Sequence, residues 1–260
     1  MKPLLLLFLL VALPLQAAKK PNILLVSIDD LNDWTGCLGG HPQAKTPNID
    51  RLAARGTLFA HAHCQSPVCN PSRASLMTGR HPHSTGVYFL GPDLKKAPKL
   101  EGVKTMPEHF QAAGYRTIAV GKLFHGGDGR FFQEYGGSNG GMGPRPKKKI
   151  SQPHGHPLWD WGAFPDNDEL MPDYKNAQWA IEKLKSEPAD SPTPFFLAVG
   201  FYRPHVPMFA PQKWFHMHPR ENIKLPIVKE DDREDLSPYA IALTNEEHVS
   251  PLHSWVESAG

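Results

Sequence analysis

The stretch NILLVSIDD, residues 22–30, combines an uninterrupted apolar run with two terminal aspartates. Apolar side chains on both faces are typical of a strand buried inside a parallel sheet that helices cover. In open α/β sheets, ligands bind beyond the carboxyl ends of the strands. The stretch therefore predicts an interior strand and places Asp29 and Asp30 at the edge of the sheet where a functional site is expected.

Segments further along the chain alternate between helical and strand patterns. In 46–56, TPNIDRLAARG, apolar residues recur at helical spacing after Thr46 and Pro47, and Gly56 ends the pattern. The same reasoning predicts a short strand at 57–64, a helix at 71–80, a helix and then a strand within 104–127, a helix at 172–187 and a strand at 193–201. This alternation predicts an α/β sandwich. Residues 126–157, rich in Gly and Pro and without a period, are interpreted as an irregular excursion over the active face.

The composition fits a globular chain and excludes some partners. Hydrophobic residues make up 40% and charged residues 21%, which argues against disorder. Lys and Arg number 28 against 26 for Asp and Glu, and a net charge of +2 gives no electrostatic footprint for nucleic acid. The length suits one large domain or two small ones.

The first eighteen residues, MKPLLLLFLLVALPLQAA, have one lysine, an apolar run from Leu4 to Leu15 and small residues at the end. This is the pattern of a secretory signal peptide. The apolar run is shorter than the ~20 residues that usually span a bilayer, so a membrane anchor is the minor alternative. No later stretch is apolar enough to span a bilayer, so no stable membrane anchor is expected. The sequence predicts a signal peptide at 1–18, a mature chain at 19–260 and an exported, periplasmic, extracellular or lumenal protein.

Exported proteins usually pair their cysteines, but this chain has three: Cys37, Cys64 and Cys69. An odd number leaves at least one without an internal partner. One interpretation is a disulfide between Cys64 and Cys69, or between Cys37 and Cys64, with a buried thiol left over.

Cys69 opens the stretch CNPSRASLMTGR, residues 69–80. If the segment from Pro71 is helical, Cys69 lies near a helix N-terminus, where backbone N–H groups favour negative charge. An angular step of ~100° per residue points Cys69, Arg73 and Arg80 in one direction. Two guanidinium groups around a reactive side chain suit a tetrahedral oxyanion such as sulfate or phosphate. The alternative is two surface arginines and a core thiol.

The full string resembles the signature of type I, formylglycine-dependent sulfatases, and matches it at its cysteine, its Pro-Ser-Arg core and its Thr-Gly-Arg close. The resemblance extends from Pro21 to about Pro226. Within the family, the chain is similar to the iduronate-2-sulfatase branch. The branch assignment rests on the form VGKLFH, where many relatives carry a tryptophan before the histidine. The segments that carry the resemblance are IDDLNDWTGCLGG, TPNIDRLA, VCNPSRASLMTGRHP, VGKLFHGG and FFLAVGFYRPHVP.

The resemblance implies an alkaline-phosphatase-like sandwich, with a mixed, mostly parallel sheet flanked by helices. It also implies that Cys69 is converted to formylglycine by a formylglycine-generating enzyme during export. Asp29, Asp30 and the modified residue 69 would bind calcium, an ion that prefers hard oxygen ligands. For the two aspartates alone, an Asx turn or helix cap is the competing interpretation.

The remaining roles also follow from the resemblance. Arg73 would stabilise the formylglycine, Lys122 and His125 would contact the sulfate and the leaving oxygen, and His205 would be a further sulfate contact or the proton donor. One hydroxyl of the hydrated aldehyde would attack sulfur, and the second would expel sulfate. The substrate would be a sulfated saccharide of the 2-O-sulfated uronic acid type, such as a glycosaminoglycan, with Arg80 as a further binding residue.

The end of the chain departs from the family pattern. Family members continue with a strand bearing an Asp followed by His or Asn, and with a further lysine that contacts sulfate; residues 248–260, HVSPLHSWVESAG, contain no such segment. The expectation is therefore the N-terminal part of a sulfatase catalytic domain. The alternatives are an inactive remnant that at most binds sulfated glycans, or a phosphate or phosphonate ester hydrolase of the same superfamily.

Overall fold

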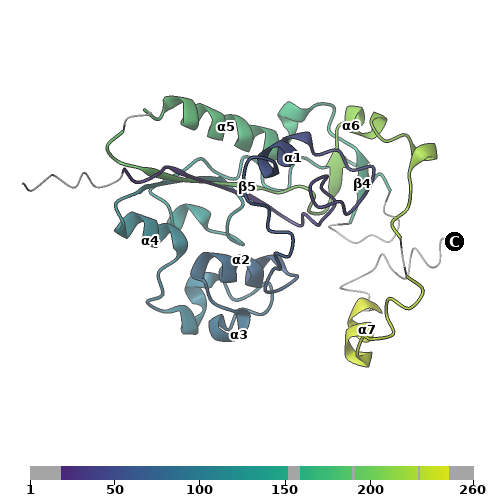
Figure 1. Ribbon diagram of the computed structural model, residues 1–260, viewed down its shortest axis with the longest axis horizontal. Helices are drawn as coiled ribbons and strands as arrows, with labels where there is room; N and C mark the ends of the chain where they lie inside the picture. Colours follow the sequence, from purple (N-terminus) through teal and green to yellow (C-terminus); the bar gives the residue numbers. More distant parts are fainter. Residues whose placement is uncertain (1–18, 152–158, 189–190, 228, 246–260) are drawn as a thin grey trace, which may run out of the picture.

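The computed structural model describes residues 19–151, 159–188, 191–227 and 229–245, and its centre is a four-stranded sheet (Figure 1). The strands are β1 (Ile23–Ile28), β2 (Arg116–Gly121), β3 (Glu134–Tyr135) and β5 (Phe195–Phe201), in the spatial order β1-β5-β2-β3. Every pair in this sheet is parallel. The predicted α/β class is confirmed.

Helices cover both faces of the sheet, as alternating side chains require. On one face, α5 (Pro172–Ser186) packs through Ala180 on Ile118, Val120, Leu197 and Val199, all buried. On the other face lie α2 (Cys69–Thr78) and α4 (Met106–Ala112), over a larger core that includes Met77, Ala119, Phe196 and Ala198. Figure 1 shows α5 on one side of the strands and α2 and α4 on the other.

The position predicted for the first strand was wrong. In the described chain β1 lies at an edge of the sheet, and Leu24 and Val26 are each 48% exposed. Their equivalents on the neighbouring strand, Leu197 and Val199, are at most 2% exposed because α5 covers them. Apolar side chains on both faces show that a strand is suited to burial on both sides. They do not identify the segment that would cover the second side.

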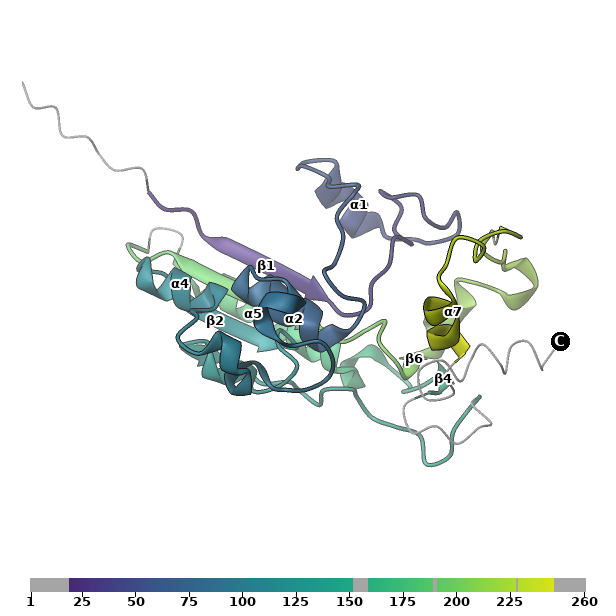
Figure 2. The ribbon, with the colours of Figure 1, turned by 90° about the horizontal axis from the view of Figure 1, so that it is seen from below.

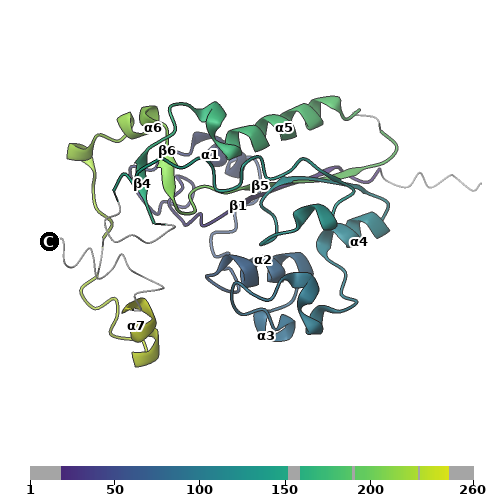
Figure 3. The ribbon, with the colours of Figure 1, turned by 180° about the vertical axis from the view of Figure 1, so that it is seen from behind.

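The remaining elements are short and lie outside the main sheet. They are α1 (Pro47–Ala53), α3 (Pro82–Thr85), η1 (Leu94–Lys96), η2 (Pro98–Leu100), η3 (Asp128–Arg130), β4 (Trp161–Ala163), η4 (Asp168–Leu170), β6 (Met208–Ala210), α6 (Gln212–His216), η5 (Arg220–Asn222) and α7 (Pro238–Asn245). β4 and β6 form a second, parallel two-stranded sheet. Figure 3 shows this small sheet and α6 beyond one end of the main sheet.

Two further predictions need correction. Residues 57–64 form no strand: they are exposed, Phe59 to 75%, and no strand of the described residues pairs with them. Within the excursion at 126–157, Glu134 and Tyr135 add strand β3 to the main sheet, and residues 152–158 lie outside the described residues. The predicted signal peptide at 1–18 also lies outside them. Among the described residues, no helix has the length and apolar character needed to cross a membrane.

Candidate functional site

Three strands of the main sheet carry polar side chains past their carboxyl ends. Asp29 and Asp30 follow β1, Lys122 follows β2, and His205 lies four residues after β5. The Lys122 backbone N–H donates to the Gly200 carbonyl at 3.0 Å, which fixes the exit of β2 against β5. Because the strands are parallel, all these side chains gather at one end of the sheet, where NILLVSIDD predicted Asp29 and Asp30.

Helix α2 delivers the cysteine and an arginine to the same edge. It begins at Cys69, after Val68 in extended conformation, and Pro71 occupies its first turn, where a missing N–H costs nothing. The predicted position of Cys69 at a helix N-terminus is therefore confirmed. Arg73, one turn further, is 6% exposed and points back toward the strand ends.

Asp29, Arg73 and Lys122 form a buried ionic cluster. The Arg73 guanidinium donates to Asp29 Oδ1 at 2.7 Å and to the Lys122 carbonyl at 2.7 Å, and Lys122 Nζ pairs with Asp29 Oδ2. The Asp29 side chain is 4% exposed, and that of each cation 7%. Burial opposes ionisation of Asp29, but the two cations outweigh it and lower its pKa. Two buried positive charges against one negative charge leave the cluster suited to an anion.

Cys69 and His205 form the second pair at this edge. Burial raises the pKa of the Cys69 thiol, but a hydrogen bond with His205 and the charge of Lys122 outweigh it, so the net shift is downward. The same hydrogen bond raises the pKa of His205, against the effect of burial. His205 Nδ1 lies 2.6 Å from the Val206 carbonyl, and Nε2 lies 3.9 Å from Asp30 Oδ2. The backbone carbonyl of Val206 therefore holds Nδ1 of the His205 ring.

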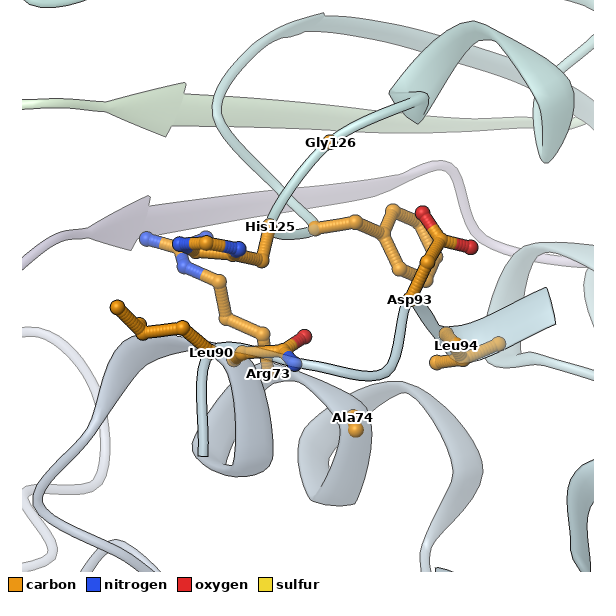
Figure 4. Close-up of a pocket in the computed structure, with 9 residues that line it drawn as sticks. Arg73, Ala74, Leu90, Asp93, Leu94, His125 and Gly126 are labelled. Atoms are coloured by element: carbon orange, nitrogen blue, oxygen red, sulfur yellow. The ribbon is translucent and has the colours of Figure 1, made fainter. Parts of the chain in front are cut away.

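His125 lies on the other side of Arg73, in a cavity of about 110 Å³. Figure 4 shows its ring beside the guanidinium group, with Leu90 below and Asp93 toward the opposite end of the cavity. The strand end that carries Lys122 continues through two buried residues into His125, whose own side chain is exposed. The structure therefore places His125 and Arg73 in the lining of one cavity.

A larger cavity, of about 310 Å³, adjoins the cysteine on the side of β1. Asp29, Asp30, Cys69 and Arg73 line its polar part, and Leu76 is among its apolar lining residues. Asp30 has a positive φ of 57°, a backbone conformation that aspartate tolerates better than most residues. The cavity provides room for an anion next to the thiol.

Sequence reasoning missed two residues that support His205. Both oxygens of Asp173, in the first turn of α5, accept backbone N–H bonds at 2.8 Å, one from Tyr202 and one from Arg203. The Arg203 side chain donates to the His205 carbonyl at 2.7 Å. Burial raises the pKa of Asp173 and lowers that of Arg203. An aspartate after a helix-initiating proline was the available signal, but nothing local linked it to a loop 30 residues away.

Arg80 does not join the site. Helix α2 ends at Thr78, and Gly79 reverses the chain with a φ of 67°. Arg80 is exposed past the far end of the helix from Cys69. The angular argument ignored the rise along the axis: eleven residues at ~1.5 Å each separate two positions by ~16 Å even when they point the same way.

The same geometry bears on the expected calcium site and on the expected disulfide. Asp29 and Asp30 are hard oxygen donors of the kind calcium prefers, but the ion takes six to eight oxygens. No group of three or more metal-ligating side chains forms among the described residues, and Asp29 is already paired with two cations. The described residues therefore do not make a calcium site by themselves. Cys37, Cys64 and Cys69 are free thiols, so neither candidate disulfide is present.

The fold and the site define a class: a parallel α/β protein with a cysteine at a helix N-terminus and a buried ionic cluster, rich in cations, at the carboxyl ends of its strands. The chain belongs to the sulfatase family, whose model matches residues 21–244.

Individual relatives agree with this assignment. A sulfatase of Formosa agariphila is 40% identical over 258 residues, covering 93% of this chain and 50% of the relative. Human iduronate 2-sulfatase is 33% identical over 216 residues, covering 78% of this chain and 38% of the relative. The solved structure of a 2-O GAG sulfatase aligns with a TM-score of 0.50 at 29% identity, covering 71% of this chain and 35% of that one. The chain thus spans half or less of the length of these relatives.

Proposed function

We propose that this chain carries the nucleophile of a sulfatase that hydrolyses sulfate esters on a saccharide. The observation that carries the proposal is the position of Cys69 at the start of α2, where it lines one cavity with Asp29 and Arg73 of the buried cluster. Membership of the sulfatase family supports it.

The side chains of the site divide the chemistry between them. A formylglycine made from Cys69 supplies a hydrated aldehyde, with one hydroxyl to attack sulfur and a second to release sulfate. Lys122 and Arg73 stabilise negative charge on the sulfate oxygens from buried positions, where such stabilisation is strong. His205, within hydrogen-bond reach of residue 69, is placed to hold or deliver a proton there, and its raised pKa favours the protonated form near neutral pH. His125, which shares a cavity with Arg73, contacts the leaving oxygen of the ester.

Asp29 and Asp30 are proposed as part of a calcium site whose other donors lie outside the described residues. When bound, calcium would supply positive charge for the sulfate oxygens, with Asp29 and Asp30 among the residues that would hold it. Conversion of Cys69 requires a formylglycine-generating enzyme, and export through the leader at 1–18 would deliver the protein to a periplasmic, extracellular or lumenal space.

The proposed substrate is a 2-O-sulfated uronic acid residue or a similar glycosaminoglycan unit. One relative is named for iduronate 2-sulfate chemistry and one structural neighbour is described as a 2-O GAG sulfatase. A phosphate or phosphonate ester is the second candidate, because a cationic cluster of this type accepts either oxyanion.

Two measurements test the proposal. Mass spectrometry of the exported protein should find formylglycine at residue 69, and unmodified cysteine would refute the covalent mechanism. Hydrolysis of an aryl sulfate but not an aryl phosphate, measured with and without calcium, should identify the reaction. Activity on the phosphate alone would favour the second candidate, and no activity under any metal would favour an inactive remnant that binds sulfated glycans.

A further inference from the structure

A third cavity lies where α5 begins, apart from the two cavities of the candidate site. Its volume is about 430 Å³, and it is lined by residues of the glycine-rich loop after β3, of the chain after β4 and of the first turns of α5. None of the described residues lines both this cavity and those beside Cys69 or His125. Figure 2 shows β4 beyond the arrowheads of β1 and β2, at the same end of the main sheet as the candidate site. The proposed function leaves this third cavity without a role.

The lining of the third cavity combines apolar rings with a few polar groups. Phe164 is among the apolar residues, whereas Asn139, Asp166 and Lys175 contribute an amide, a carboxylate and an ammonium group. The Asn139 amide donates to Asn176 Oδ1 at 2.8 Å, and because Asn176 is fully buried this bond fixes Asn139 at the cavity wall. Such a mixed lining suits a sugar, since apolar rings pack against its C–H faces while amide and carboxylate groups bond to its hydroxyls.

A cationic segment borders the same cavity. Residues 145–149, RPKKK, place four positive charges directly after Pro144, which lines the cavity. The segment is tied again at Ile150, whose side chain lies against Gly162, two residues before Phe164. Five residues reach at most ~18 Å even when fully extended, so the charges stay near the cavity between these two ends. The electrostatic field of the segment therefore favours an anionic ligand.

The side chain of Arg203 links the third cavity to His205. It donates to the His205 carbonyl at 2.7 Å, and it also donates to the Met142 carbonyl in the glycine-rich loop. The next residue of that loop, Gly143, lines the cavity, and a Cβ added there would lie 3.7 Å from the Arg203 guanidinium group. The third cavity is therefore a neighbour of the candidate site on the side of His205.

We propose that the third cavity and residues 145–149 form a second saccharide-binding site, which takes a sulfated or carboxylated sugar unit other than the one whose ester is cleaved. The anionic substituent lies toward Lys175 and the cationic segment, where it gains charge-assisted hydrogen bonds. The ring packs on Phe164, and its hydroxyls meet Asn139 and Asp166. The choice of a saccharide as ligand rests on the proposed function, but binding at this site requires no catalysis.

The test is calorimetric titration of the full chain, expressed without a formylglycine-generating enzyme so that Cys69 stays a thiol. The ligand is a size-defined heparin tetrasaccharide, which consists of sulfated uronic acid and glucosamine units. Uncharged maltotetraose is the control ligand and should bind at least about tenfold more weakly. Amide hydrogen exchange should slow in residues 139–144 and 164–175 when the heparin fragment binds. Slowing confined to residues 69–73 and 122–125 would place the ligand in the candidate active site and overturn the proposal.

A matched pair of charge reversals on α5 locates the site. Lys175→Glu should weaken binding about fivefold or more, because an attractive charge becomes a repulsive one. Lys185→Glu makes the same change in net charge at an exposed lysine ~15 Å further along the helix axis, and this variant should bind like the parent. Equal effects of the two substitutions would show a diffuse positive field and overturn the proposal.

Asp166→Ala separates sugar recognition from charge attraction alone. Loss of a carboxylate would strengthen the binding of any polyanion, but here it also removes a hydroxyl acceptor, so binding should weaken about threefold or more. Circular dichroism checks that each variant folds. Unchanged or tighter binding by this variant would overturn the proposal, as would failure of the parent chain to bind the heparin fragment. Formylglycine formation and aryl sulfate hydrolysis are measured separately, so failure of this site is distinguishable from failure of the proposed function.

Discussion

Replacing Arg73 with methionine tests whether the buried ionic cluster stabilises the fold as well as the site. Arg73 makes one charge-assisted hydrogen bond to Asp29 and one to the Lys122 carbonyl. Their loss should cost about 1.5–3 and about 1 kcal/mol respectively. Arg73 Nε is buried without a partner among the described residues, so its removal returns about 1 kcal/mol. The expected loss in free energy of unfolding is therefore about 1.5–3 kcal/mol. Lys122 stays paired with Asp29, which avoids the larger penalty of an isolated buried carboxylate.

The assay is equilibrium urea unfolding at pH 7, followed by tryptophan fluorescence. Arg55→Met, at an exposed arginine on the chain after α1, is the control and should change stability by less than about 0.5 kcal/mol. A loss below about 1 kcal/mol in the Arg73 variant would refute the reasoning. The pH dependence gives a second check. The lowered pKa of Asp29 contributes stability above the unfolded value of ~3.9 that is lost as the pH falls through the folded pKa, so parent and variant should converge in acid.

Three further predictions concern the thiol, the sheet and the metal. In unmodified protein, His205→Ala should slow iodoacetamide alkylation of Cys69 several-fold at pH 7, because it removes a hydrogen bond that lowers the thiol pKa; an unchanged rate, read by mass spectrometry, would contradict this. Gly121→Ala should destabilise the chain by more than about 3 kcal/mol, since its φ is 79° and the new Cβ would lie 1.9 Å from the Gly200 carbonyl oxygen, whereas Gly79→Ala, with φ 67° and open space, should cost about 1–2 kcal/mol; equal losses in urea unfolding would disprove the steric argument. Millimolar calcium should leave the melting temperature of this chain alone unchanged within the error of calorimetry, because too few ligands gather among the described residues; a clear rise would show a complete site.

The sequence predicted those parts of the fold that depend on local patterns. Strands β2 and β5 and helix α5 follow from apolar periodicity, and Cys69 lies at a helix start because Pro71 favours a first turn. The errors concern relations between segments. The apolar pattern of β1 could not say which segment lies beside it, and the angular position of Arg80 left out its height on the helix. The pairing of Asp173 with the backbone before His205 joins positions that no local pattern connects.

Strand β1 connects the exposed edge of the described sheet to the candidate site. Asp29 and Asp30 follow its last residue, and both line the cavity that also contains Cys69. Asp29 is held there by Arg73 from helix α2 and by Lys122 from the end of strand β2. Three separate elements therefore fix one carboxylate, so a change that loosens β1 should alter the cavity as well as the sheet.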